Sequence, residues 1–183
     1  DSPALMGYEG IIARIYFAAM GEIVPQHFLF TKRTKQPPTD PVNSMLSFGY
    51  TLLMYEIYTA ILNQGLHPYF GFFHKLKNKH PALASDLLEE WRAVIIDSMV
   101  MSLVQHHEVK TEHFQENKDT AGVYLTREGR KIFLHAYEKK MRAVNQYMQG
   151  KFSYRHCLER QAADFSQTIM AEDISLYEPV FLR

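Results

Sequence analysis

The chain has 183 residues, of which 46% are hydrophobic and 13% aromatic, enough for one globular domain with a sizeable core. Its 20 basic and 20 acidic residues cancel, so no overall field attracts nucleic acid or a membrane, and any polyanion site must be local. The single cysteine, Cys157, excludes an internal disulfide framework and fits a reducing compartment. No apolar run reaches the roughly 18 residues of a membrane span. Because the chain begins at Asp1 without methionine, we interpret it as a fragment of a longer protein.

The predicted elements are almost all helices, because apolar residues recur at helical spacing and convincing β alternation is absent. The first segment is apolar on nearly every side, a pattern typical of a largely buried helix. Pro41 in a first turn, Gly65 as a stop and Ser85 as an N-cap mark later boundaries. Residues 123–126 could form a small strand pair or a turn. We expect an all-α fold in a single domain, residues 1–183, with helices over residues 7–20, 41–64, 85–107, 126–148 and 153–173.

Motifs of several enzyme classes are missing from the sequence. It has no GxxxxGK[ST], GxGxxG or HExxH pattern, no Cys-rich zinc pattern and no ExxH pair. These absences exclude the common forms of P-loop nucleotide hydrolysis, dinucleotide binding, zinc proteolysis and ferritin-like di-iron chemistry.

Acidic residues and one histidine form a candidate metal site. Glu9 stands alone in an apolar helix, where a carboxylate costs several kcal/mol unless something compensates it. His74 follows a GFF turn, and Asp86, Glu89 and Glu90 share one helical face, where a cation would relieve their repulsion. One imidazole with carboxylates suits magnesium or manganese. We therefore hypothesise a metal bound jointly by Glu9, His74 and Glu89.

Simpler explanations of the same residues stay open at this point. Acidic residues in the first turn of a helix are favoured by the helix dipole alone. His74 is one of nine histidines and could be structural or lie on the surface. Glu9 could pair with Arg14 or Arg92.

Several motifs, in order along the chain, resemble the catalytic domain of the CRISPR-associated integrase family, the first-numbered Cas protein. GYEGIIARIYF resembles the family's G-x-E-G-x-x-A-R-x-Y-F, and RTKQPPTDPVNSMLSFGYTLLMYEI resembles R-x-R-x-P-P-x-D-P-V-N-x-x-L-S-x-G-Y-x-x-L. GLHPYFGFFH is similar to G-L-D-P-x-x-G-F-L-H, and SDLLEEWR to x-D-L-M-E-E-F-R. YLTREGRKIFLHAYEKKM resembles the late helical region, so the similarity covers nearly the whole chain.

The resemblance implies a metal-dependent DNA endonuclease and integrase of CRISPR adaptation, which inserts spacer DNA into the repeat array by transesterification. It implies Glu9, His74 and Glu89 as ligands of manganese or magnesium, with Asp86 beside them as a further catalytic residue. Implied partners are DNA (spacer precursor and CRISPR repeat) and the small, second-numbered Cas subunit. The full-length protein would be a homodimer in the prokaryotic cytoplasm, without a membrane, and would carry an N-terminal β domain that is absent here.

Other residues are weaker candidates around this site. Arg92 could contact DNA or brace Glu89 or Glu9, Asn43 could lie near the site or cap a helix, and Tyr55 could lie near the site or pack on a helix. Two other classes stay open, a helical phosphohydrolase or nuclease unrelated to CRISPR and a non-catalytic helical scaffold. Loop-borne Lys and Arg suit phosphate contacts, and the candidates are Lys32, Arg33, Lys35, Lys75 and Lys77.

Overall fold

The computed structural model describes residues 2–74, 80–147 and 150–180. The chain divides into two compact units, one of residues 1–49 with 98–136 and one of residues 50–97 with 137–183. The expectation of one catalytic domain over the whole chain stays a prediction, because two compact units can belong to one domain.

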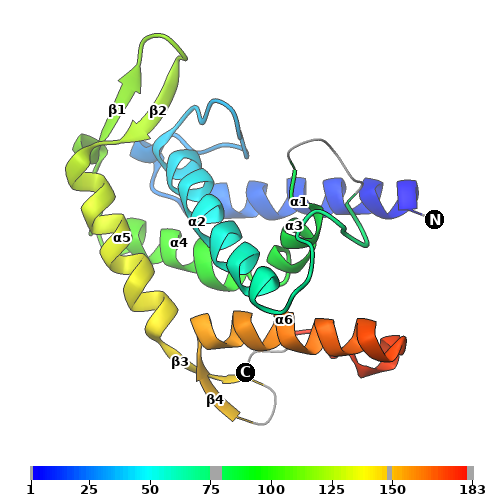
Figure 1. Ribbon diagram of the computed structural model, residues 1–183. Coiled ribbons are helices and arrows are strands. Elements are labelled where there is room, and N and C mark those ends of the chain that lie inside the picture. The colour runs from blue at the N-terminus through cyan, green and yellow to red at the C-terminus, as the bar shows by residue number, and fades with distance from the viewer. Residues whose placement is uncertain (1, 75–79, 148–149, 181–183) are drawn as a thin grey trace. The chain divides into compact units, whose positions relative to one another are not determined.

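Helices dominate both units, but the expected all-α fold is only partly confirmed (Figure 1), since two antiparallel β-hairpins interrupt them. The helices are α1 (Ser2–Ile23), α2 (Pro41–Asn63), α3 (Ala82–Leu88), α4 (Ser98–Gln105), α5 (Arg127–Arg142) and α6 (Tyr154–Ala171). A π-helix spans Ala93–Asp97, and short 3₁₀ turns span Gln26–Phe28, Thr111–His113 and Ile174–Leu176. The hairpins pair β1 (Phe114–Asn117) with β2 (Gly122–Leu125) and β3 (Val144–Tyr147) with β4 (Gly150–Ser153).

In the first unit, the start of α2 organises the preceding loop. Asp40 caps the helix, because its Oδ1 accepts a hydrogen bond from the Asn43 amide at 2.9 Å. Asn43 is fully buried, and its Oδ1 accepts from the Thr34 amide at 2.9 Å while its Nδ2 donates to the Lys32 carbonyl at 2.8 Å. Burial raises the pKa of Asp40, and the Asn43 hydrogen bonds oppose that rise. The predicted start of the second helix at Pro41 is confirmed.

The β1–β2 hairpin connects α4 to α5 along the chain and projects beyond the first turn of α5 (Figure 1). Its register places Phe114 opposite Leu125 and Asn117 opposite Gly122. The Val123 amide donates to the Pro38 carbonyl at 2.8 Å, so the loop before α2 is joined to β2. The expected strand or turn near residues 123–126 is therefore a strand of a hairpin.

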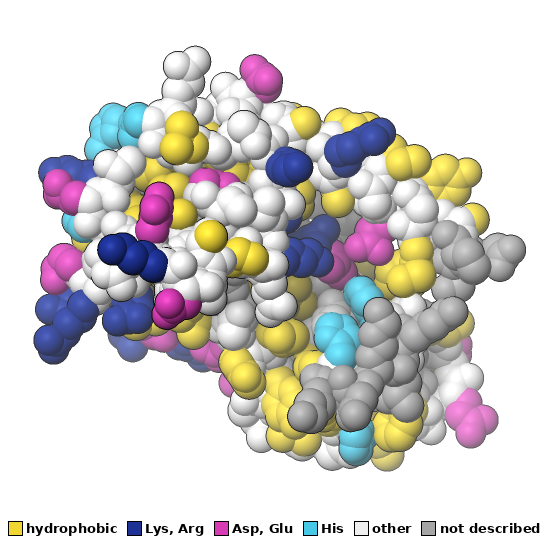
Figure 2. Space-filling view, turned by 90° about the horizontal axis from the view of Figure 1, so that it is seen from above, with side chains coloured by type: hydrophobic (Ala, Val, Ile, Leu, Met, Phe, Trp, Pro, Cys, Tyr) yellow, Lys and Arg dark blue, Asp and Glu magenta, His cyan; other side chains and the backbone are white. Residues whose placement is uncertain are grey.

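The predicted burial of the first helix is wrong. Only Phe17 and Met20 among the large apolar residues of α1 are buried, and Figure 2 shows that hydrophobic side chains also reach the surface at several places on the face it displays. Apolar composition leads to burial only where another surface covers the helix, so composition alone does not decide whether α1 is buried. The remaining large apolar side chains of α1 are 40–65% exposed: Leu5, Met6, Tyr8, Ile11, Ile12, Ile15, Tyr16 and Ile23.

The second unit has a core built around Trp91. The indole is fully buried, its Nε1 donates to Gln161 Oε1 at 2.8 Å, and its ring lies 5.7 Å from that of Tyr147. Tyr147 lies on β3, where a continuation of the preceding helix had been expected. That helix ends at Arg142 because the chain turns into the β3–β4 hairpin, which brings Tyr147 onto the indole.

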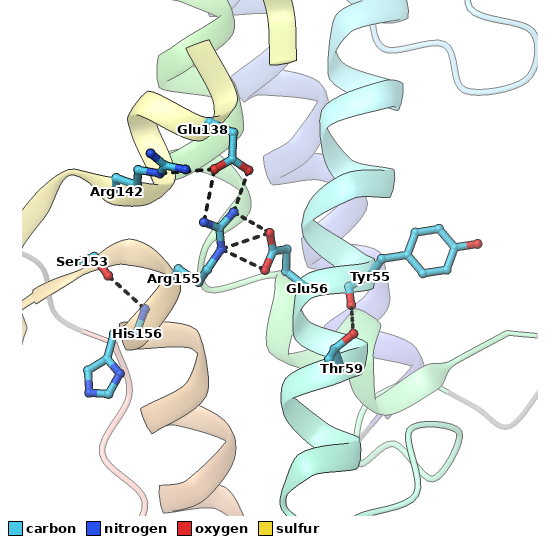
Figure 3. Close-up of polar contacts among 8 residues, drawn as sticks. All are labelled: Tyr55, Glu56, Thr59, Glu138, Arg142, Ser153, Arg155 and His156. Atoms are coloured by element: carbon cyan, nitrogen blue, oxygen red, sulfur yellow. Dashed lines mark hydrogen bonds and ion pairs between the residues drawn. The ribbon is translucent and has the colours of Figure 1, made fainter. Parts of the chain in front are cut away.

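An ion cluster joins three helical segments of the second unit (Figure 3). Arg155 on α6 donates to both carboxylate oxygens of Glu56 on α2, the shortest contact being 2.8 Å, and to both of Glu138 on α5, the shortest being 2.9 Å. Arg142 lies 3.5 Å from the same Glu138 carboxylate. Arg155 therefore holds together two carboxylates that would otherwise repel.

The expected helix over residues 85–107 is broken, and Ser85 is not its N-cap. α3 begins after Pro81, whose carbonyl accepts the Ser85 amide at 3.0 Å inside the helix. The chain then passes through a turn and the π-helix before α4. Two tertiary hydrogen bonds hold the chain where the helix is broken. Trp91 donates to Gln161, and the Tyr50 hydroxyl donates to buried Asp97 at 2.5 Å.

α2 is long and apolar enough to cross a membrane by length and composition, contrary to the expectation that no segment would reach that length. Helices in the core of a soluble protein pass the same test. Six apolar residues of α2 are fully or almost fully buried: Val42, Met45, Leu46, Leu53, Ile57 and Ile61.

Candidate metal and DNA site

Asp86 anchors the loop that ends in His74. The carboxylate is fully buried on α3, and its Oδ2 accepts the amides of Phe72 at 2.7 Å and Phe73 at 3.0 Å. Its Oδ1 accepts the His74 amide at 2.9 Å and lies 2.6 Å from His74 Nδ1. One carboxylate therefore fixes three consecutive peptide groups and the imidazole.

This contact decides which nitrogen of His74 can bind a ligand. A carboxylate only accepts hydrogen bonds, so the network assigns the hydrogen between them to Nδ1, and a neutral imidazole then carries its lone pair on Nε2. The side chain is 24% exposed, so it is not closed off from solvent. A carboxylate on one imidazole nitrogen and a metal on the other is a frequent arrangement at metal sites. That Asp86 is itself catalytic stays a prediction. Its observed contacts are those of a residue that positions His74.

The loop conformation also needs Gly71. A Cβ atom at this position would lie 2.5 Å from Asp86 Oδ2 and 2.8 Å from the Ala82 Cβ, distances that real Cβ atoms do not adopt. Gly71 thus lets the loop approach α3 closely enough for the amides to reach the carboxylate.

Glu89 lies at the end of α3, not in its first turn. It is the C-cap residue of this helix, and the first turn of α3 contains no acidic residue. The dipole of α3 does not favour a carboxylate there, so the helix-dipole explanation of Asp86 and Glu89 is wrong for this helix. Arg92 contacts both oxygens of Glu89, with Nε 3.0 Å from Oε2 and Nη1 3.1 Å from Oε1. Arg92 therefore braces Glu89, one of the two roles considered from the sequence.

Glu90 has a structural role that the sequence did not reveal. Its Oε1 accepts from Gln161 Nε2 at 3.1 Å and from the Tyr177 hydroxyl at 2.6 Å, and its Oε2 accepts the Val180 amide at 2.8 Å. Burial, followed by the bond to Glu90, raises the pKa of Tyr177. Glu90 thus holds the chain that follows α6, and the neighbouring Glu89 faces Arg92.

Glu9 belongs to the first unit, whereas His74 and Glu89 belong to the second. Its side chain is partly exposed on α1, and it forms no hydrogen bond or ion pair with another described residue of the first unit. The alternative pairing of Glu9 with Arg92 stays a prediction, and the Arg92 guanidinium contacts Glu89. Within the described segments, no three His, Cys, Asp or Glu side chains gather closely enough to hold a metal ion. The joint ligation by all three residues stays a prediction.

The basic residues before α2 differ in their contacts. Lys32 and Lys35 are exposed, as phosphate contacts require. Arg33 donates to Asn43 Oδ1 at 2.9 Å and to Ser47 Oγ at 3.0 Å, so part of its guanidinium is used to hold the loop against α2. The candidates Lys75 and Lys77 lie outside the described residues.

Tyr55 does not pack into the core. Tyr55 on α2 is 65% exposed, and its ring points away from the Glu56 cluster in Figure 3. Sequence reasoning also overlooked His80, whose ring centroid lies 6.0 Å from that of His74 and whose Nε2 lies 3.2 Å from Ser85 Oγ. No motif drew attention to His80, because its approach to His74 depends on the tertiary structure.

A family model described as CRISPR associated protein Cas1 matches residues 1–139. The chain belongs to the Cas1 family. A CRISPR-associated endonuclease Cas1 of Mycobacterium tuberculosis is 39% identical over 170 residues, which cover 91% of this chain and 50% of that protein. One from Thermus thermophilus is 38% identical over 185 residues, covering 100% of this chain and 55% of that protein. The chain thus spans about half the length of these Cas1 relatives.

Solved structures share the fold. A casposase bound to integration product superposes with a TM-score of 0.89 at 22% identity, over 99% of this chain and 52% of that one. The Cas1-containing chain of a Cas6-RT-Cas1–Cas2 complex gives a TM-score of 0.86 at 27% identity, over 98% of this chain and 20% of that one. These likenesses place the two β-hairpins within a fold that Cas1 proteins share.

Proposed function

We propose that the chain is the catalytic part of a metal-dependent DNA endonuclease and integrase of CRISPR adaptation. Membership of the Cas1 family supports this proposal, and the matched relatives are named endonucleases. The observation that carries it is the His74–Asp86 contact, because a buried carboxylate on Nδ1 leaves Nε2 as a metal-binding nitrogen.

The proposed metal ligands are His74 Nε2 and the carboxylates of Glu89 and Glu9. Nitrogen and oxygen donors of this kind suit manganese or magnesium. When bound, such a metal lowers the pKa of an attacking hydroxyl and stabilises the charge that develops on a phosphate. Asp86 keeps the imidazole in one tautomer and orientation, and Arg92 holds the Glu89 carboxylate in place.

The proposed reaction is a transesterification. The 3′-hydroxyl oxygen of the incoming spacer DNA forms a new bond to a phosphorus atom of the repeat. The bond from that phosphorus to its former bridging oxygen breaks, and the proton lost by the attacking hydroxyl is balanced by one gained by the leaving oxygen. With water as the attacking group, the same residues would cleave DNA without joining it.

The proposed partners follow from the same reaction. Exposed lysines such as Lys32 and Lys35 would contact DNA phosphates, and the DNA would be a spacer precursor and a CRISPR repeat. A Cas1–Cas2 complex is among the solved structures that share the fold, which supports the small second Cas subunit as a partner. We also propose a homodimer of the full-length protein, acting in the prokaryotic cytoplasm.

Replacement of the ligands tests the proposal. Glu89→Ala and His74→Ala should abolish the rise in melting temperature that manganese causes, since this rise depends on metal affinity for the folded state. DNA joining by the full-length protein with its partner subunit should be lost, while DNA binding persists. The matched control is Glu128→Ala, which removes an exposed acid from the first turn of α5 and should leave metal response and joining intact. A Glu89 variant that melts at a lower temperature yet joins DNA at the parental rate would contradict the metal-ligand role.

A further inference from the structure

Tyr177 lies on the chain that turns back at the end of α6 (Figure 1). The reversal begins at Glu172, which caps α6 in the left-handed conformation with a φ of 54°. Asp173 then caps the 3₁₀ turn Ile174–Leu176, and the Tyr177 amide closes this turn by donating to the Ile174 carbonyl at 3.2 Å. The backbone that carries Tyr177 is therefore held by local hydrogen bonds, and its side chain is directed by contacts with distant segments.

The hydroxyl of Tyr177 reaches the end of α3. It donates to Glu90 Oε1 at 2.6 Å and accepts from Gln161 Nε2 at 3.1 Å, while Gln161 Oε1 accepts the Trp91 indole at 2.8 Å. Burial raises the pKa of Tyr177, so the hydroxyl keeps its proton near neutral pH. Because Glu90 directly follows Glu89, these hydrogen bonds hold the chain beside a proposed metal ligand.

The ring of Tyr177 supports the loop that ends at His74. Its centroid lies 5.7 Å from that of Phe165 on α6, and the two rings meet edge to face at 88°. Phe165 is buried and lies 5.5 Å from the ring of Phe72. The Phe72 amide donates to the Asp86 carboxylate that also binds the His74 imidazole. Tyr177 thus reaches this loop through one intervening ring.

We infer that Tyr177 is a positioning residue that couples the loop ending at His74 to the end of α3 at Glu89. Ligands whose segments are already held in place bind a metal at a smaller cost in ordering entropy. Residues that orient metal ligands are for this reason needed for full metal affinity. The inference rests on the proposed function, because it takes His74 and Glu89 as metal ligands. The coupling itself requires no metal and is measurable without one.

Hydrogen exchange of the full-length protein in EDTA tests the coupling without metal. Tyr177→Leu removes both the ring and the hydroxyl, so amides of residues 72–74 and 88–91 should exchange about tenfold faster, as loss of a ring pair and a hydrogen bond permits. Tyr177→Phe keeps the ring and removes only the hydroxyl. Its exchange should rise in residues 88–91 and stay parental in residues 72–74.

Calorimetry with manganese tests what the coupling does for the ligands. Both Tyr177 variants should bind manganese about tenfold more weakly than the parent, and Tyr177→Leu should be the weaker of the two. Saturating manganese should return DNA joining by the Tyr177→Phe variant to the parental rate, because a positioning residue does not touch the reacting atoms. The control for general loss of stability is Arg155→Met, which removes a clamp of the same unit and should leave manganese affinity unchanged.

Parental exchange of both segments in Tyr177→Leu overturns the inference, and so does an equal loss of manganese affinity in Arg155→Met. If Tyr177→Leu does not fold, Tyr177→Phe decides, since parental exchange in residues 88–91 with parental manganese affinity overturns the coupling. A parent that binds manganese and joins DNA, with Tyr177 variants of parental affinity, contradicts the inference alone. A parent that neither binds manganese nor joins DNA contradicts the proposed function, and faster exchange in the variants would still support the coupling.

Discussion

His74 Nδ1 lies 2.6 Å from Asp86 Oδ1, although the two residues are 12 positions apart in the chain. The same carboxylate accepts three backbone amides of the loop, so both of its oxygens are occupied by donors. Asp86 and His74 therefore act as one unit, in which a change at the carboxylate should reach the imidazole.

Asp86→Asn should show whether Asp86 positions the His74 imidazole for metal binding or only stabilises the fold. The amide has nearly the same shape as the carboxylate, but its NH₂ group cannot accept hydrogen bonds. The loop donors that faced the replaced oxygen would therefore lose their acceptor. Unpaired buried donors cost about 1–3 kcal/mol, so the melting temperature should fall. Manganese affinity measured by calorimetry should also fall, by about 10–100-fold, because the imidazole loses its orienting partner. The control is Asp119→Asn on an exposed turn, and unchanged manganese affinity in the Asp86 variant would limit that residue to loop anchoring.

Gly71→Ala should destabilise the second unit. The added methyl group would meet the Asp86 carboxylate and the Ala82 backbone at less than 3.0 Å, so the loop or α3 must move. Overpacking of this kind costs about 1–3 kcal/mol, which thermal or urea unfolding would detect. Gly7→Ala is the matched control, because nothing lies within 4 Å of its added Cβ, and within α1 it should raise stability by about 0.5–1 kcal/mol. A stable Gly71 variant with parental manganese affinity would show that the close approach is not required.

Arg155→Met should destabilise the fold more than Arg142→Met. The first change leaves the Glu56 and Glu138 carboxylates without the guanidinium that both contact, whereas Arg142 is 77% exposed and contacts Glu138 alone. We expect a loss of about 1–3 kcal/mol for Arg155 and less than about 0.5 kcal/mol for Arg142, measured by urea unfolding. Equal effects of the two variants would contradict the clamp role of Arg155.

The Arg155 cluster should also make stability depend on pH. The hydrogen bond from Arg155 lowers the pKa of Glu138 below its ordinary 4.5. A lowered carboxyl pKa in the folded state contributes stability that is present above pH 4.5 and is lost as the pH falls through the lowered value. Unfolding free energies of the parent should therefore decline in this acidic range, and the Arg155→Met variant should show a shallower decline.

Lys32→Ala and Lys35→Ala should weaken DNA binding without lowering stability. Both side chains are exposed, and loss of one phosphate contact should reduce the slope of log affinity against log salt by about 1. Arg33→Ala should instead lower the melting temperature, because its guanidinium holds Asn43 and Ser47. If the salt slope is unchanged in both lysine variants, this loop does not contact phosphates.

Cys157 should resist alkylation in the native protein. Its side chain is fully buried on α6, and burial raises the pKa of the thiol to about 11, so very little reactive thiolate exists near neutral pH. Iodoacetamide labelling followed by mass spectrometry should modify Cys157 in urea and leave it intact in buffer. Rapid labelling of the native protein would contradict this burial.

The sequence by itself determined features that depend only on residues close together in the chain. The Asp40 cap and Pro41 set the start of α2, and Gly65, with a φ of 74°, follows its end, as local backbone rules require. The family motifs also lie within short segments, which is why family membership could be predicted from them and was confirmed. The helical character of most of the chain follows from periodicity in the same way.

Only the tertiary structure decided which side chain meets which. The sequence placed Asp86, Glu89 and Glu90 together on one helical face, with Glu89 as the predicted metal ligand. The fold gives them different partners: the 72–74 loop for Asp86, Arg92 for Glu89, and the chain after α6 for Glu90. Periodicity reports that a residue lies on a helix, but a hydrogen bond between residues 12 or 90 positions apart depends on where the intervening chain folds. The exposure of α1 was unpredictable for the same reason, because burial depends on a covering surface and not on the apolar residues alone.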